Sequence, residues 1–264
     1  MKRRSLLLFI VPSIALSIHG IAAAQVRDIN DAINKAGRQR MLSQRVAKAY
    51  LALGQAVRKD HAERVLGESM ALFDRQLFEL KAFSPKPEIK ATYEQLETAW
   101  SAYKGVLVGA AASKPGAESV VTSANQVLAL ANQGTVQLES LSGKPVGKLV
   151  NIAGRQRMLS QRMAVMYLAA SWGVQADTAV KEMNTARDEF VRAQAVLEAA
   201  PESSAAIKAE LELAEQQYSF FDTALRTLRP GSANPTLLGD VFTTSERILQ
   251  VMDGVTGMYA RLTG

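Results

Sequence analysis

The sequence predicts an all-α fold made of two tandem antiparallel four-helix bundles, packed as an intramolecular pseudo-dimer through their first helices. This prediction rests on three features. The decapeptide AGRQRMLSQR occurs twice, at residues 36–45 and 153–162, which are 117 residues apart. Apolar residues recur with the helical period, and the prolines after residue 24 fall between these runs. The chain contains no cysteine, which excludes disulfides, thiolate metal sites and a cysteine nucleophile.

The first 24 residues are typical of an export signal. Residues 2–4 are basic, the 13 residues 6–18 are apolar, and three alanines at 22–24 offer a cleavage site. The apolar run is shorter than the roughly 20 residues that a membrane-spanning helix needs. We therefore expect cleavage after Ala24 and a periplasmic or otherwise exported chain without a membrane span. An uncleaved anchor is the alternative.

The charge of the chain does not favour nucleic acid as a partner. Removal of residues 1–24, which hold three basic and no acidic residues, lowers the net charge from +6 to +3. Nucleic-acid-binding domains usually carry a concentrated basic face, and a charge this small gives no support for one. We therefore expect no nucleic-acid partner.

The first unit, residues 25–143, is predicted to hold four helices. The first helix ends at Gly54, because glycine commonly ends a helix. Pro85 and Pro87 separate the second helix from the third, and Pro115 separates the third from the fourth, since proline costs about 3 kcal/mol inside a helix. The expected ranges are 27–54, 58–83, 88–112 and 117–141.

The second unit, residues 144–264, repeats this layout. Its first helix begins near Pro145 and ends at Gly173, and Pro201 separates the second helix from the third. Pro230 and Pro235 lie before the fourth helix. The expected ranges are 146–173, 177–199, 203–228 and 236–262. Helices of about 25 residues with short connections indicate an up-down bundle.

The similarity between the two units extends beyond the decapeptide. FDRQLFEL at residues 73–80 matches FVRAQAVL at residues 190–197 in its Phe, Arg and Leu positions. The segments at the end of each unit, residues 125–143 and 246–264, share their apolar pattern and a final glycine. A duplicated unit is the simplest explanation.

A helical wheel shows two apolar faces on the first helix of each unit. One face holds larger side chains and suits the core of its own bundle; in the first unit these are Leu42, Val46, Ala49 and Leu53. The opposite face is lined with small residues and has Arg40 or Arg157 at its centre. Because a bundle covers only one face of each helix, we expect the two small-residue faces to pack together and to place Arg40 across from Arg157.

Two facing guanidinium groups need a compensating negative charge. At about 6 Å and an effective dielectric constant of about 20, they repel by about 3 kcal/mol. Either carboxylates of the bundles or a bound anion must offset this repulsion, and arginine suits small oxyanions because its donors lie in one plane. Both alternatives stay open from the residues alone. The other basic residues in the motif or just after it are expected on a solvated face: Arg38, Arg45, Lys48, Arg155 and Arg162.

The repeated motif resembles the P-box of membrane-bound nitrate/nitrite sensor kinases and of the N-terminal domain of PilJ-type chemotaxis transducers, which are linked to type IV pili. The matching residues are Asn34, Ala36, Gly37, Arg40, Met41, Ser43 and Arg45, and again Asn151, Ala153, Gly154, Arg157, Met158, Ser160 and Arg162. The resemblance covers the first helix of each unit. In that family, two periplasmic four-helix bundles hold one nitrate between their P-box helices.

The resemblance implies a binding site for a small anion, nitrate or nitrite above all. Its residues would be Arg40, Arg157, Gly37, Gly154, Asn34 and Asn151. Gly37 and Gly154 are also expected to allow close packing, with or without a ligand. Charged residues follow both motif glycines, as Arg38 and Arg155, and leave chlorate- and phosphate-like anions open as ligands.

We therefore expect an exported sensory or binding module that signals through a partner, since no kinase or methyl-accepting helix is recognisable in the sequence. The partner would be a membrane-bound sensor, a chemoreceptor or a pilus component. The alternative is a ligand-free structural or interaction module of the envelope or of the type IV pilus system. An enzyme, a cofactor and a metal site are not expected, because His61 is the one histidine after residue 24 and no catalytic motif is present.

Overall fold

The structure, a computed structural model, describes residues 25–109 and 111–262. The expected export signal at residues 1–24 therefore lies outside the described residues. The described part forms eight helices and no strand, which confirms the all-α prediction: α1 (Ile29–Gly54), α2 (Lys59–Phe83), α3 (Pro87–Val108), α4 (Lys114–Ser142), α5 (Pro145–Ser171), α6 (Ala176–Ala199), α7 (Ala205–Leu225) and α8 (Pro235–Ala260). None of these helices combines the length and the apolar character needed to span a membrane.

Caps and prolines explain where the helices begin. The side chain of Asp28 accepts a hydrogen bond from the backbone nitrogen of Asp31 at 2.8 Å, which caps α1. Proline is the first residue of α3, α5 and α8, where its missing N–H has no intrahelical acceptor to lose. The predicted gap between α3 and α4 is displaced, because Ser113 caps α4 and its first turn accommodates Pro115.

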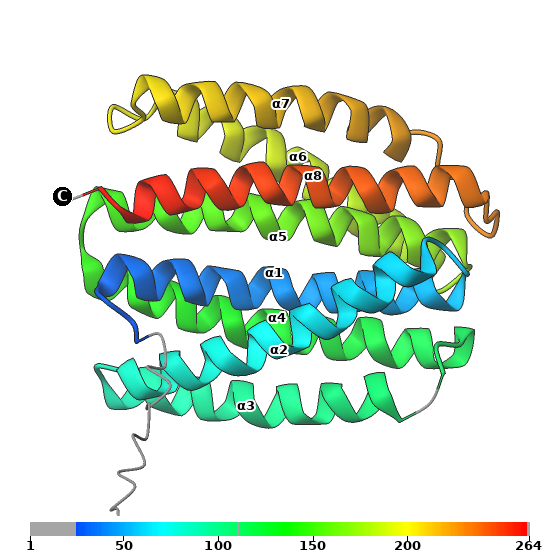
Figure 1. Ribbon diagram of the computed structural model, residues 1–264, viewed down its shortest axis with the longest axis horizontal. Coiled ribbons are helices and arrows are strands. Elements are labelled where there is room, and N and C mark those ends of the chain that lie inside the picture. Colours follow the sequence, from blue (N-terminus) through cyan, green and yellow to red (C-terminus); the bar gives the residue numbers. More distant parts are fainter. Residues whose placement is uncertain (1–24, 110, 263–264) are drawn as a thin grey trace, which may run out of the picture.

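α1 and α5 lie side by side at the centre of the molecule (Figure 1). α1 packs against α2 and α4, and α3 completes this group through its contact with α4. In the same way, α5 packs against α6 and α8, and α7 contacts α8. α8 also contacts α1, and α4 also contacts α5, so the two central helices are covered from both groups.

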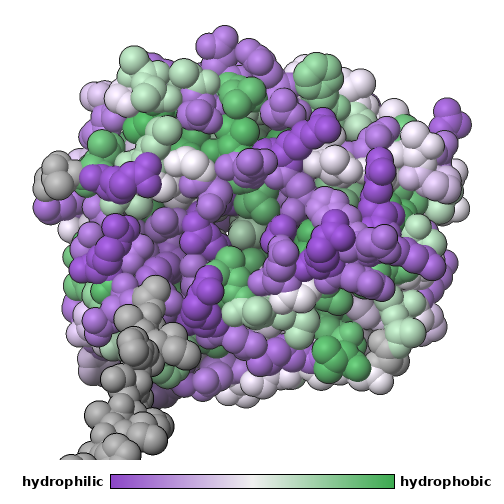
Figure 2. Space-filling view, in the orientation of Figure 1, coloured by the Kyte–Doolittle hydropathy of each residue, from purple (hydrophilic) through white to green (hydrophobic). Residues whose placement is uncertain are grey.

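The two central helices are buried almost all round. From Asp31 to Ala52, each residue of α1 is buried except Arg38 and Arg45, which are partly exposed. From Ala153 to Ser171, each residue of α5 is buried except the corresponding pair, Arg155 and Arg162. This burial agrees with the two apolar faces read from the sequence. The outer face in Figure 2 instead mixes hydrophilic and hydrophobic residues.

Candidate functional site

The two motif glycines lie against each other where α1 meets α5. A Cβ atom added to Gly37 would lie 3.7 Å from the Cα of Gly154, and one added to Gly154 would lie 3.8 Å from the Cα of Gly37. The Cβ at Gly37 would also lie 3.3 Å from Nη2 of both Arg40 and Arg157. The missing side chains therefore make room for two guanidinium groups between the helices.

Each arginine reaches across to the backbone of the other helix. Nη2 of Arg40 donates to the carbonyl oxygen of Asn151 at 3.1 Å, and Nη2 of Arg157 donates to the carbonyl oxygen of Asn34 at 3.0 Å. The structure thus brings together all the residues that the resemblance implicated. The asparagines meet the arginines through their backbone carbonyls, whereas their side-chain Oδ1 atoms are buried and accept no hydrogen bond among the described residues.

The two arginines differ in their remaining partner. Nη1 of Arg157 forms an ion pair with Asp253 on α8 at 2.5 Å. Nη1 of Arg40 instead donates to the amide oxygen of Asn132 on α4 at 3.0 Å. Within residues 25–109 and 111–262, Arg40 forms no ion pair with a carboxylate. A ligand-free packing site would pair both arginines with carboxylates, and in the described part of the chain such a pair is found for Arg157 but not for Arg40.

Burial dominates the electrostatics of the site, because both guanidinium groups are completely buried. Burial, followed by the positive charges of Arg155 and Arg157, lowers the pKa of Arg40 to about 9. Burial also lowers the pKa of Arg157 to about 10, against the attraction of Asp253. Both arginines therefore remain protonated at neutral pH. Although burial acts to raise the pKa of Asp253, Arg157 and Arg38 lower it to about 2.

The other basic residues in or just after the first motif copy lie at a helix interface, so the prediction of a solvated face is wrong for them. Lys48 is completely buried, and its Nζ lies 2.6 Å from Oε1 of Glu246. Arg45 also pairs with Glu246 at 2.6 Å, and Arg38 pairs with Asp253 at 2.7 Å. The reason is that α8 packs against α1 and brings acidic side chains to the face of α1 that the helical wheel assigned to solvent.

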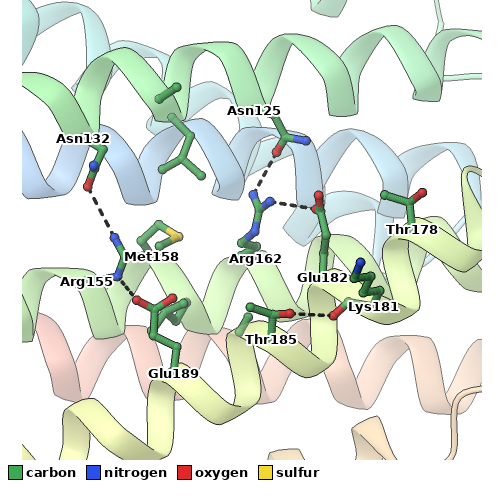
Figure 3. Close-up of a pocket in the computed structure, with 14 residues that line it drawn as sticks. Asn125, Asn132, Arg155, Met158, Arg162, Thr178, Lys181, Glu182, Thr185 and Glu189 are labelled. Carbon is green, nitrogen blue, oxygen red and sulfur yellow. Dashed lines mark hydrogen bonds and ion pairs between the residues drawn. The ribbon is translucent and has the colours of Figure 1, made fainter.

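In the second copy, Arg155 and Arg162 line a groove of about 600 Å³ between α4, α5 and α6 (Figure 3). Arg162 donates to Asn125 at 2.9 Å and pairs with Glu182 at 2.8 Å. Arg155 pairs with Glu189 and donates more weakly to Asn132 at 3.4 Å. Both side chains are partly exposed but held by acids of α6, so the solvated-face prediction is wrong in part here as well.

The uncharged residues of the motif make the same bonds in both copies. Nε2 of Gln39 and Gln156 donate to the carbonyl oxygens of Phe73 and Phe190 at 3.3 and 3.0 Å. Gln44 and Gln161 tie the central helices to α4 and α8 in the same manner. Each glutamine therefore satisfies a buried backbone carbonyl of a neighbouring helix. These matching contacts account for both glutamine positions of the repeated decapeptide.

Among the residues of this network that sequence reasoning missed are Asn132, Glu246 and Asp253. A signal for them was present, because the aligned segments 125–143 and 246–264 place Asn132 opposite Asp253 and Asn125 opposite Glu246. At both positions, the first unit carries an amide where the second carries an acid. The two halves therefore differ in charge outside the repeated decapeptide.

The sequence also matches the model of a known protein family. The family model described as "Type IV pili methyl-accepting chemotaxis transducer N-term" (PilJ) matches residues 21–131 and 142–218. No curated protein and no solved structure matches the chain. The matched residues cover more than half of the chain and include both copies of the decapeptide. The chain therefore belongs to the PilJ family of N-terminal chemotaxis transducer domains, a family of sensory signalling modules.

Proposed function

We propose that the protein is an exported sensory module that binds a small oxyanion, most simply nitrate or nitrite, between α1 and α5. The observation that carries this proposal is the pair of completely buried guanidinium groups, Arg40 and Arg157, with a single carboxylate, Asp253, paired to them in the described part of the chain. A buried charge is costly unless it is paired. Guanidinium donors and a planar oxyanion fit each other in geometry and in charge.

The reciprocal contacts of α1 and α5 support a pseudo-dimer of two sensor units, residues 25–143 and 144–264. Arg40 bonds Asn151 as Arg157 bonds Asn34, which is the pattern that a twofold axis between two subunits produces. An anion held by both helices would favour one packing of α1 against α5 over others. Such a ligand shifts the equilibrium between packings only by its difference in affinity for them.

The change in packing would be passed to a partner of the chemotaxis or pilus system, such as a membrane-bound sensor, a chemoreceptor or a pilus component. Membership of the PilJ family supports a partner of this class. The export signal expected in residues 1–24 supports a periplasmic location for the encounter.

The test is isothermal titration of residues 25–264 with nitrate, nitrite, chlorate and phosphate. The wild-type protein is expected to bind at least one of the first two. Arg40→Ala is expected to abolish binding, and Arg157→Ala is expected to weaken it, because it leaves the carboxylate of Asp253 without its buried partner. Arg187→Ala is a matched control, because Arg187 pairs with Asp222 at 2.5 Å on the outer helices α6 and α7. Failure of the folded wild-type protein to bind any of these anions would overturn the proposal.

A second candidate is a ligand-free structural or interaction module of the envelope or pilus. The observation in its favour is the Arg157–Asp253 ion pair, which neutralises part of the site from within the chain. This alternative predicts that both arginine variants lose stability in urea unfolding, while nitrate leaves the unfolding midpoint of the wild-type protein unchanged. A rise of the midpoint with nitrate concentration favours the sensory module instead.

A further inference from the structure

Asp253 holds two arginines of α1 and α5 through one carboxylate. Its Oδ1 accepts from Nη1 of Arg157 at 2.5 Å and from Nη2 of Arg38 at 2.7 Å. Arg157 is buried and Arg38 is partly exposed. A negative oxygen therefore touches the buried guanidinium directly, from the α8 side of the site.

Asn132 occupies the corresponding position on α4 and makes the corresponding contacts. Its Oδ1 accepts from Nη1 of Arg40 at 3.0 Å and from Nη1 of Arg155 at 3.4 Å. Again one arginine is buried and the other is partly exposed. The geometry is that of Asp253, with longer distances, but the oxygen that joins the two guanidinium groups belongs to a neutral amide.

The acids near this second arrangement do not take the place of the missing carboxylate. Glu139 and Glu189 lie near enough to raise the pKa of Arg40, against the larger effect of burial. Glu139, however, accepts its hydrogen bond from the side chain of Asn151, and Glu189 pairs with Arg155. Arg40 thus contacts neutral oxygens alone among the described residues.

A groove open to solvent reaches Asn132 and Arg155, whereas Arg40 is completely buried and does not line it. Asn132 and Arg155 line the groove of about 600 Å³ between α4, α5 and α6, and Figure 3 shows the two side chains pointing toward each other across it. Arg40 lies directly behind Asn132, at hydrogen-bond distance from its amide oxygen. An anion in the groove therefore reaches Arg40 only after the Asn132 side chain moves aside.

We propose that the anion binds away from the pseudo-twofold axis between α1 and α5. It lies between Arg40 and Arg155, in place of the Asn132 amide oxygen. In the other half of the chain, the carboxylate of Asp253 supplies the negative charge at the equivalent position. This inference rests on the proposed function and makes it more specific. The ligand is one small monoanion per chain, of the size of a carboxylate. Glu189, which lines the groove from α6, repels a second negative charge, so nitrate, nitrite and formate are favoured over phosphate.

The test compares variants of residues 25–264 by isothermal titration with sodium nitrate at constant ionic strength. Asn132→Asp places a carboxylate where the ligand would bind, so nitrate affinity is expected to fall at least tenfold. Asn132→Ala removes the competing oxygen without adding charge, so affinity is expected to be retained or to rise. Asp253→Asn opens the equivalent position, and the stoichiometry is expected to change from one nitrate per chain to two.

Asn125→Asp is the matched control, because Asn125 lies on the same wall of the groove two helical turns from Asn132. Its nitrate affinity is expected to stay within about twofold of wild type. If the wild-type protein binds nitrate and Asn132→Asp binds it equally well, the off-axis site is wrong while the proposed function stands. If the wild-type protein binds no anion, the proposed function and this inference both fail. Loss of affinity in Asn132→Ala as large as in Asn132→Asp also contradicts the inference, since it would make the amide itself the binding group.

Discussion

Replacing Glu246 with glutamine is expected to destabilise the protein by about 3–5 kcal/mol, because it leaves a buried ammonium without its carboxylate. Lys48 is completely buried, and its Nζ lies 2.6 Å from Glu246. Its remaining neighbours are the hydroxyl of Ser245 at 2.9 Å and the ring of Phe242, whose centroid lies 4.5 Å away. Neither neighbour carries a charge that would compensate the ammonium.

The pKa of Glu246 gives an independent magnitude. Although burial acts to raise it, Lys48 and Arg45 lower this pKa from 4.5 to about 2. The difference corresponds to about 3 kcal/mol of favourable interaction with the ionised carboxylate in the folded state. The contacts with Ser245 and Phe242 survive the substitution, so the lower end of the range is the better expectation.

The second half of the chain offers the compensating change. Val165 and Asn125 stand at the positions that correspond to Lys48 and Glu246. The double variant Lys48→Val/Glu246→Asn introduces the residue types of Val165 and Asn125, and it removes the ammonium together with the carboxylate. It is expected to be more stable than Glu246→Asn alone, with a coupling energy of about 2 kcal/mol or more in a double-mutant cycle.

Urea unfolding followed by circular dichroism at 222 nm measures these differences. Glu97→Gln serves as the control, because its ion pair with Lys81 is exposed and should change stability by less than about 0.5 kcal/mol. A loss below about 1 kcal/mol for Glu246→Gln would refute the reasoning. So would a double variant whose loss equals the sum of the two single losses.

Gly54→Ala is expected to cost about 1–3 kcal/mol, because its Cβ would lie 2.2 Å from the ring of Trp172; an unchanged thermal midpoint would contradict this close contact. Gly37→Ala would place a Cβ 3.3 Å from Nη2 of Arg40. It is expected to weaken nitrate binding at least tenfold, with a stability change below about 1 kcal/mol because helix propensity offsets crowding; wild-type affinity in calorimetry would argue against it. Glu246 has a lower pKa folded than unfolded, so its contribution is complete above pH 4.5 and is lost as the pH falls toward about 2. Acid titrations of stability should show this loss in the wild-type protein and much less of it in Glu246→Gln.

The helices could be predicted because their signals are local. Proline at Pro87, Pro145 and Pro235 marks a helix start by its own geometry, and the structure begins α3, α5 and α8 at these residues. The packing of α1 against α5 could also be predicted, because a helix that is apolar on two faces needs a neighbour on each face. Both inferences use the chain's own pattern and no knowledge of the other helices.

The position of Lys48 could not be predicted in the same way. A helical wheel assigns a basic residue to solvent unless a partner is known, and the partner, Glu246, lies on a helix that is 198 residues distant in sequence. The role of Asn34 and Asn151 was hidden for a different reason. They meet the arginines through backbone carbonyls, which every residue has, so no side-chain pattern reports them.

The charge difference between Asn132 and Asp253 has a consequence for any sensor built from one chain. In a homodimer, a twofold axis gives both central arginines the same second partner, so a substitution on the fourth helix changes both sides at once. Here the two positions lie in one chain and change independently, and the buried Arg157 contacts a carboxylate while the buried Arg40 contacts an amide. The charge of the proposed site is therefore set on α4 and α8, outside the repeated decapeptide. It follows that two proteins with the same two decapeptides can differ in the anion they bind.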